Sequence, residues 1–291
     1  MEDERFRTVK FADLICPDWQ TLDEEGRQKA GRYLGHVIDS YFVWGELIKR
    51  ELPLYRELFK DVINFTGNPE EDLRLASGYK LLERSKRFPD HQISKYDSGT
   101  DEILGVINGL PVSDEFLERM VKKPDVYGKY ISVSGNYIFD ITPDLVGKNR
   151  ICSSVASRTA GTGTHLIFHA LSQSLANEER CLVFTRSNGY RTFKEKYGDT
   201  IEKYVELVTA GHLEGDRSAL GLHSYLGKKL KSMQGFYVKQ KDNTVTLFDA
   251  EGFNVVAIFP DSRPADVDSG GYCILGEHKA KAKSQVVSFS A

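Results

Sequence analysis

The short segment Arg158–Thr164, with the sequence RTAGTGT, constrains the fold of this chain more than any other feature. It lies between a β-branched run, Arg150–Ala156, and a stretch whose apolar residues recur at helical spacing. A helix N-terminus carries unpaired N–H groups and about half a positive charge. Glycines directly before it let an anion approach the backbone closely. The segment therefore predicts a strand, then a phosphate-binding loop, then a helix, with a pyrophosphate as ligand.

The familiar phosphate loops do not fit this segment. A Walker A loop needs a lysine after its last glycine, and Gly163 is followed by Thr164. A dinucleotide-binding fingerprint needs a third glycine, which is absent here. Arg158 could add a charge-assisted contact to a phosphate, and Thr162 or Thr164 a hydroxyl.

The rest of the chain mixes helices and strands. The first third reads as helical, with Asn68 and Pro69 as N-cap and first residue of a helix. Downstream, the helix after the loop precedes an apolar strand, Cys181–Thr185, and two further helical stretches. Apolar or β-branched runs predict other strands at 102–110, 129–133, 137–142, 244–248, 253–259 and 272–276. This order favours an α/β sheet covered by helices.

Composition excludes several classes of protein. The 39 lysines and arginines against 42 acidic residues leave a net charge of −3, which argues against a general binder of nucleic acid or anionic membranes. Four separated cysteines form no CxxC pair, so neither a disulfide scaffold nor a cysteine-rich zinc site is expected. The charged N-terminus has no apolar core of a signal peptide, and no stretch could cross a bilayer. We therefore expect a cytoplasmic protein.

The RxxGxG pattern between a strand and an amphipathic helix resembles the acyl-CoA pyrophosphate loop of GNAT acetyltransferases (GCN5-related N-acetyltransferases). Later motifs are similar to a longer GNAT subgroup, which includes domains appended to nitrilase-like amidases. They are Gly189-Tyr190, EKYV at 202–205, GHLEGD at 211–216 and GYCIL at 271–275. The resemblance covers roughly Glu102 to Glu277.

The resemblance implies a twisted, mixed, mostly antiparallel sheet flanked by helices, whose parallel strands splay apart near the loop. We expect three parts: a helical N-terminal part at 1–98 on the acceptor side, an acyl-CoA-binding domain at 99–278, and a flexible tail at 279–291.

The resemblance also implies site residues. The pyrophosphate would lie on the backbone of Arg158, Thr159, Ala160, Gly161, Thr162, Gly163 and Thr164. The strand before the loop would pair with the pantetheine arm. That strand is either Tyr137–Thr142, contributing Ile141 and Thr142, or Arg150–Ala156. Asn188 falls in a turn that lies beside the cofactor in this family.

Catalytic candidates follow from the same resemblance. The tyrosine that protonates the leaving thiolate in the family falls nearest Phe193, so Tyr190 and Tyr197 on either side are its candidates. Asp140 could act as a general base for the amine, or orient one.

The implied function is transfer of an acyl group, most simply acetyl, from acetyl-CoA to a small-molecule or peptide amine by direct attack in a ternary complex. No metal is required, and a homodimer stays open. Two alternatives remain: a GNAT-like domain that decarboxylates malonyl-CoA or loads acyl groups onto a carrier protein, and a non-catalytic acyl-CoA sensor or interaction protein.

Other residues have competing interpretations. His165 and His169 share one helix face, as metal ligands or as polar residues of the helix flank. His223 could line the acceptor side or be a core histidine. Cys152 and Cys181 could be nucleophiles or inert buried residues. The lysines of 227–231 and of the tail could bind CoA phosphates or an acidic partner, or simply be solvated.

Overall fold

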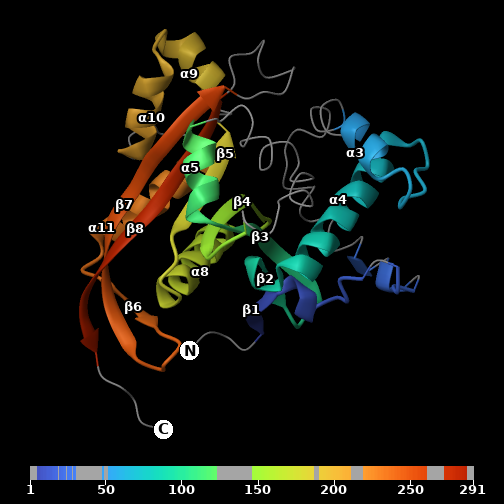
Figure 1. Ribbon diagram of the computed structural model, residues 1–291, viewed down its shortest axis with the longest axis horizontal. Coiled ribbons are helices and arrows are strands. Elements are labelled where there is room, and N and C mark those ends of the chain that lie inside the picture. Colours follow the sequence, from blue (N-terminus) through green and yellow to red (C-terminus); the bar gives the residue numbers. More distant parts are fainter. Residues whose placement is uncertain are drawn as a thin grey trace. The chain divides into compact units, whose positions relative to one another are not determined.

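The computed structural model describes residues 5–18, 20–23, 25–27, 29–30, 48, 52–122, 146–186, 190–210, 219–260 and 272–286. These residues form two compact units (Figure 1). The first unit contains the described residues up to Gly109 together with Val155–Leu166, and the second contains the others. Segments of the two units therefore alternate along the chain.

Three antiparallel strands form the sheet of the first unit. β1 (Phe6–Lys10) pairs with β2 (Gln92–Asp97), and β2 pairs with β3 (Glu102–Val112). The register shifts at Lys95/Tyr96, so that an extra residue bulges from β3. The expectation of a purely helical first third is thus wrong at β1. Its five residues hydrogen-bond to a strand more than 80 positions away, which local periodicity does not reveal.

Helices lie between β1 and β2 in the chain. They are the 3-10 turn η1 (Phe11–Asp13), α3 (Leu52–Leu58), α4 (Pro69–Arg87) and the 3-10 turn η2 (Pro89–His91). The predicted cap of α4 is confirmed, because the Asn68 side chain accepts hydrogen bonds from the N–H groups of Glu70 and Glu71. Leu81 and Leu82 of α4 share an apolar cluster with Ile103 and Val106 of β3. This helix therefore covers one face of the β2–β3 pair.

The second unit has a mixed sheet in the order β4-β5-β8-β7-β6. Its strands are β4 (Asn149–Ser157, which ends in the first unit), β5 (Cys181–Arg186), β6 (Phe236–Lys239), β7 (Val245–Pro260) and β8 (Tyr272–Val286). β4 and β5 are parallel, and the other described pairs are antiparallel. The chain is thus a mixed α/β protein with mostly antiparallel strands flanked by helices, as the sequence predicts.

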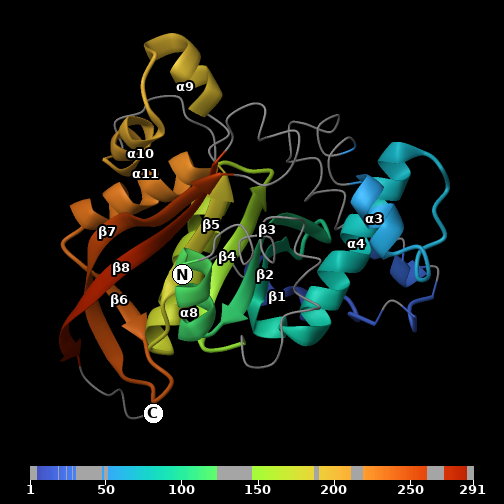
Figure 2. The same ribbon diagram turned by 45° about the horizontal axis from the view of Figure 1, so that its top comes forward.

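Five helices complete the description: α5 (Asp114–Lys122), α8 (Thr162–Ala176), α9 (Tyr190–Tyr197), α10 (Ile201–Thr209) and α11 (Ala219–Ser232). α8 begins in the first unit and continues into the second. Figure 2 shows α11 lying along β7. The approach is close, since a Cβ at Gly227 of α11 would stand 2.7 Å from the Cβ of Phe253.

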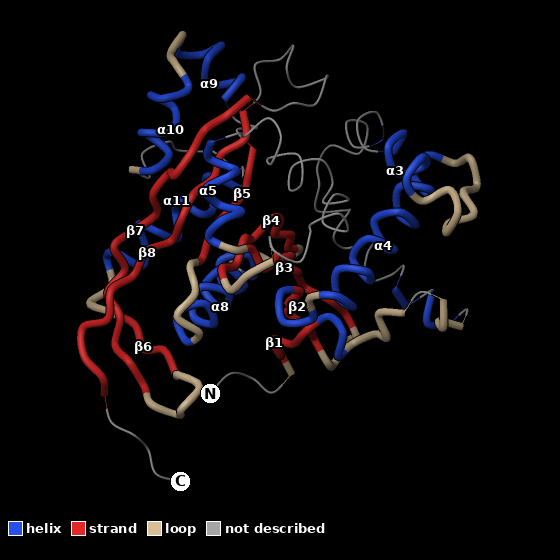
Figure 3. The backbone as a smooth tube through the Cα atoms, in the orientation of Figure 1, coloured by secondary structure: helices blue, strands red, loops and turns tan. Residues whose placement is uncertain are grey.

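The C-terminal segment differs from the sequence expectation. β8 continues to Val286, so the tail expected to be flexible from Lys279 onward is a paired strand as far as it is described. Its backbone groups bond to β7, which explains why a lysine-rich sequence is ordered there. The two strands expected at 244–248 and 253–259 form one long strand, β7 (Figure 3). Its polar middle segment stays paired with β8, and the register of the pairing shifts there. β6 and α11 were not predicted.

In the part of the chain that is described, no helix combines the length and the apolar character needed to cross a membrane.

Candidate functional site

β4 leads directly into the RTAGTG loop. It ends at Ser157, and α8 starts at Thr162. Of the two strands considered for this position, Arg150–Ala156 is therefore the one before the loop. The other, Tyr137–Thr142, lies outside the described residues, and so do the candidates Asp140, Ile141 and Thr142.

The loop is open at its tip. Residues from Arg158 to Gly161 are exposed, whereas Thr162 and Gly163 are buried. Gly161 has a φ of 83°, which favours glycine, and no atom lies within 4 Å of the position that a Cβ would occupy. The backbone therefore turns sharply in front of the helix and leaves free space beside it.

Hydrogen bonds hold the loop in place, whereas two N–H groups at the start of α8 have no described backbone acceptor. The Arg158 N–H donates to the Leu104 carbonyl of β3 (2.9 Å), at the bulge. The Thr159 and Thr162 hydroxyls lie 2.7 Å apart, and the Thr162 N–H donates to the Thr159 carbonyl. The His165 N–H donates to Gly161.

No backbone acceptor among the described residues faces the N–H groups of Gly163 and Thr164. Two unpaired amides at the positive end of a 15-residue helix suit an anion.

β4 and β5 are parallel neighbours. Their pairing is described for Arg150–Cys152 against Cys181–Val183. On its other edge, β5 pairs antiparallel with β8 along its whole length, Cys181–Arg186.

The tyrosine candidates both lie on α9. Tyr190 is its first residue, and Tyr197, its last, is 54% exposed. Phe193 is buried, with its ring centroid 5.0 Å from that of Tyr197. Tyr197 is thus largely exposed and has Lys196 over its ring, 5.0 Å from the centroid, whereas Phe193 belongs to the core. Asn188 lies outside the described residues.

His165 anchors the helix start. Its Nε2 lies 2.9 Å from the Thr8 hydroxyl of β1. Among the described residues, no three His, Cys, Asp or Glu side chains gather in a way that could hold a metal. The ring of His165 thus ties α8 to the sheet of the first unit.

The two cysteines of the β4–β5 pair are buried at 3% and 2% exposure. A hydrogen bond that the Cys181 thiol donates to the Cys152 sulfur, together with burial, holds the pKa of Cys181 well above its usual value. A protonated, inaccessible thiol is a poor nucleophile, which favours the inert interpretation of Cys181.

His223 pairs with a second histidine that the sequence analysis did not single out. Its Nδ1 lies 3.1 Å from Nε2 of His278 on β8, and both rings pack near Phe253. Burial lowers the pKa of His223 well below its usual value and that of His278 to about 4. Two neutral, buried rings show His223 as a core histidine.

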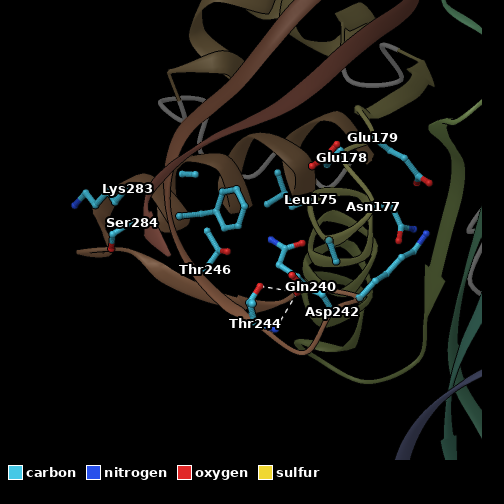
Figure 4. A pocket seen from close by; sticks show the side chains of 14 residues that line it. Leu175, Asn177, Glu178, Glu179, Gln240, Asp242, Thr244, Thr246, Lys283 and Ser284 are labelled. Carbon is cyan, nitrogen blue, oxygen red and sulfur yellow. Dashed lines mark hydrogen bonds between the residues drawn. The ribbon is translucent and has the colours of Figure 1, made fainter. Parts of the chain in front are cut away.

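A pocket of about 720 Å³ lies at the opposite end of α8 (Figure 4). It is lined by the end of α8, the β6–β7 turn, β7 and β8, and its charged lining residues are the acids Glu178, Glu179 and Asp242 and the lysines Lys241 and Lys283. Burial raises the pKa of Glu179. The pocket lies at the negative, C-terminal end of α8, whereas the predicted phosphate loop lies at the positive end, so the two are separate sites.

Comparisons with known proteins add little to this picture. No protein-family model matches the chain, and no curated protein sequence matches it. Among solved structures, one that matches is the GphF GNAT-like decarboxylase in complex with isobutyryl-CoA. The identity is 16%, the match covers 68% of this chain and 82% of that one, and the TM-score is 0.42. A TM-score this low does not establish a shared fold.

Proposed function

We propose that this chain binds acyl-CoA through the RTAGTG loop and transfers the acyl group, most simply acetyl, to an amine. The observation that carries the proposal is the loop itself. An exposed glycine turn leads from a strand into a helix with two unpaired amides, Gly163 and Thr164. The resemblance of RTAGTG to the GNAT pyrophosphate loop names the ligand, and the described geometry is compatible with it.

Several loop residues would bind the pyrophosphate of acyl-CoA. Amides at the start of α8 would hold the pyrophosphate, with the Arg158 guanidinium adding a charge-assisted contact. The resemblance implies that the pantetheine arm would pair with backbone groups of β4, the strand before the loop.

The reaction would proceed by direct attack. The amine nitrogen attacks the thioester carbonyl, and backbone N–H groups stabilise the oxyanion. The carbon–sulfur bond breaks as the amide forms, and the thiolate takes a proton from Tyr190 or Tyr197. Asp140 remains a proposed base for the proton that the amine loses. Much of the acceleration would come from holding the two reactants in position.

The same loop would serve a second reaction, decarboxylation of malonyl-CoA or acyl loading of a carrier protein. It would equally serve a sensor that binds acyl-CoA without turnover. These alternatives share the ligand and differ in the products. Transfer releases one thiol for each acyl group moved, decarboxylation releases carbon dioxide without a thiol, and a sensor releases neither.

Thermal unfolding with acetyl-CoA, malonyl-CoA and free CoA tests the shared part. A ligand at 100 times its Kd stabilises by about 2.7 kcal/mol, which raises Tm by several degrees at this chain length. We expect this rise in the wild type and a smaller one in Arg158→Ala. An unchanged Tm with all three at millimolar concentration would contradict the proposal. Net thiol release with an amine then identifies transfer, carbon dioxide release identifies decarboxylation, acylation of an added carrier protein identifies loading, and binding with none of these identifies a sensor.

A further inference from the structure

The pocket at the end of α8 lies within the second unit and is separate from the RTAGTG loop. Its volume of about 720 Å³ falls in the range that is usual for small-molecule sites, about 300–1,000 Å³. Leu175, Phe248 and Ala282 give it an apolar part. The Phe248 ring stacks on that of Phe236, with 6.1 Å between the centroids, which holds this wall in place. The pocket can therefore take the apolar part of a small molecule.

A buried hydroxyl faces this pocket. Thr246 of β7 is 5% exposed and lines the pocket, and Figure 4 shows its oxygen directed toward Gln240. In the described part of the chain, no hydrogen bond reaches this hydroxyl. Its position at the wall of a cavity sets it apart from hydroxyls packed inside the core, because a small ligand could reach it. A buried polar group without a protein partner is expected to bond to water or to a ligand.

The end of α8 gives one wall of the pocket a negative potential. The helix has 15 residues and no basic residue in its last turn, and Glu178 and Glu179 follow it. Among the described residues, no backbone N–H donates to the carbonyls of Ala176 and Asn177. The negative end of a helix dipole thus lies beside two carboxylates, and these charges repel one another unless a cation is near.

The β6–β7 turn adds a third carboxylate. Asp242 accepts hydrogen bonds from the hydroxyl (2.6 Å) and the N–H group (2.9 Å) of Thr244, which hold its pKa below the usual value, so it is ionised at neutral pH. Two lysines also line the pocket. Lys283 is paired with Asp249 (2.6 Å), which leaves Lys241 to offset three carboxylates. The remaining charge of the pocket is thus negative and favours a cation.

The cation that fits this lining is organic. Among the described residues, no three His, Cys, Asp or Glu side chains converge as metal ligands do. An ammonium or guanidinium group donates several hydrogen bonds, and carboxylate, carbonyl and hydroxyl oxygens accept them. A short apolar stem would cover Leu175 and Phe248. We propose that this pocket binds a small organic cation of this kind, at a site that does not depend on the proposed acyl transfer.

Titration with matched probes tests the charge of the ligand. 2-Phenylethylamine and n-butylguanidine are cations at neutral pH, whereas 2-phenylethanol is neutral and 3-phenylpropionate is an anion. In methyl-labelled protein, the NMR signals of Leu175, Ala176 and Ala282 report whether a probe enters the pocket. We expect both cations to shift these signals and to bind about tenfold more tightly than the other two probes. Equal affinity for the cations and 2-phenylethanol, or no shift of these signals at millimolar concentration, would overturn the proposal.

Glu178 offers a variant in which a structural role and a binding role give opposite results. Its φ is 57°, a left-handed conformation that glycine adopts more readily, and its charge lies at the negative end of α8. Glu178→Gly should therefore raise Tm by about 2 °C and yet weaken binding of 2-phenylethylamine about fivefold. Glu178→Gln keeps the left-handed backbone and should weaken binding to the same extent.

Thr246→Val and Glu206→Gln complete the test. Removing the Thr246 hydroxyl should weaken binding of 2-phenylethylamine about threefold. Glu206 lies on α10, outside the pocket, and pairs with Lys203, so Glu206→Gln should leave binding unchanged. Unchanged binding in both Glu178 variants and in Thr246→Val, or an equal loss in Glu206→Gln, would overturn the proposal.

Discussion

Glycine serves opposite purposes in two regions of this protein. In the loop before α8, Gly161 turns the backbone at a φ of 83° and has empty space beside its Cα. In the second unit, Gly276 of β8 and Gly227 of α11 both stand directly against Phe253 of β7. The first glycine keeps a surface open, and the other two let a helix and two strands approach closely. Open space in the loop is compatible with ligand binding, whereas filled space in the core contributes to stability.

Gly276→Val should have the largest effect, and only on stability. A Cβ at this position overlaps the ring of Phe253, which is 4% exposed and has nowhere to move. We expect a loss of about 3 kcal/mol in the free energy of unfolding, measured by urea denaturation. Adding Phe253→Leu should recover part of that loss. Equal losses with and without the second substitution would show that the ring is not the obstacle.

Gly161→Val should weaken ligand binding more than it lowers stability, which is the opposite of the effect expected for Gly276→Val. The left-handed φ strains a β-branched residue, and the side chain would enter the space assigned to the phosphate. We expect acetyl-CoA binding to weaken about 100-fold by calorimetry, or about 2.7 kcal/mol, with a smaller loss of stability. If stability fell as much as in Gly276→Val while binding persisted, the contrast between the two regions would be lost.

Acid should lower the stability of the second unit, because the buried rings of His223 and His278 are neutral in the folded protein. The pKa of His278 is about 4 in the folded protein against about 6.5 unfolded, so below pH 6.5 the unfolded state binds more protons. The contribution of neutral His278 to the free energy of unfolding is therefore present above about pH 6.5 and is lost as the pH falls towards 4. Between pH 7 and 5 we expect a loss of about 2 kcal/mol from His278, measured by urea denaturation.

The double variant His223→Gln/His278→Gln is the control for that pH dependence. It should flatten the slope between pH 7 and 5, even if the variant is less stable at neutral pH. A slope equal to that of the wild type would assign the acid sensitivity to other groups. Asp72 is distinguishable, because its lowered pKa places its effect below pH 4.

Arg158→Ala should have the smallest effect. Its side chain is exposed, so one charge-assisted contact to a phosphate is screened by solvent. We expect about tenfold weaker acetyl-CoA binding, or about 1.4 kcal/mol, shrinking at higher salt. Unchanged affinity at low salt would exclude Arg158 from the phosphate contact. The exposed Lys203, which is paired with Glu206 on α10, provides a control substitution.

The sequence predicts local features of this fold well. The cap at Asn68, the β3 strand and the order of β4, loop and α8 follow from spacing and residue type, because each depends on neighbours in the chain. β1 and the continuation of β8 depend on pairing with distant strands, which periodicity does not report. Residues 99–278, expected as one domain, contribute to both units.

For the candidate site, the sequence predicts the position of the turn before α8 from its glycines, and Gly161 there has a positive φ and open space beside it. Its role as a phosphate site stays a prediction. His278 was missed, because a polar residue in a strand reads as solvent-facing until burial is known, and its partner His223 lies 55 positions earlier in the sequence.

Isothermal titration of the wild type with acetyl-CoA and with S-acetyl-pantetheine tests the central claim most directly. The two ligands share the acyl group and the arm, but only acetyl-CoA carries the pyrophosphate. If the loop holds a pyrophosphate, acetyl-CoA binds at least 100-fold more tightly, and Gly161→Val removes most of that difference. Equal affinity for both ligands, or no binding of acetyl-CoA, would contradict the assignment of RTAGTG as a phosphate loop.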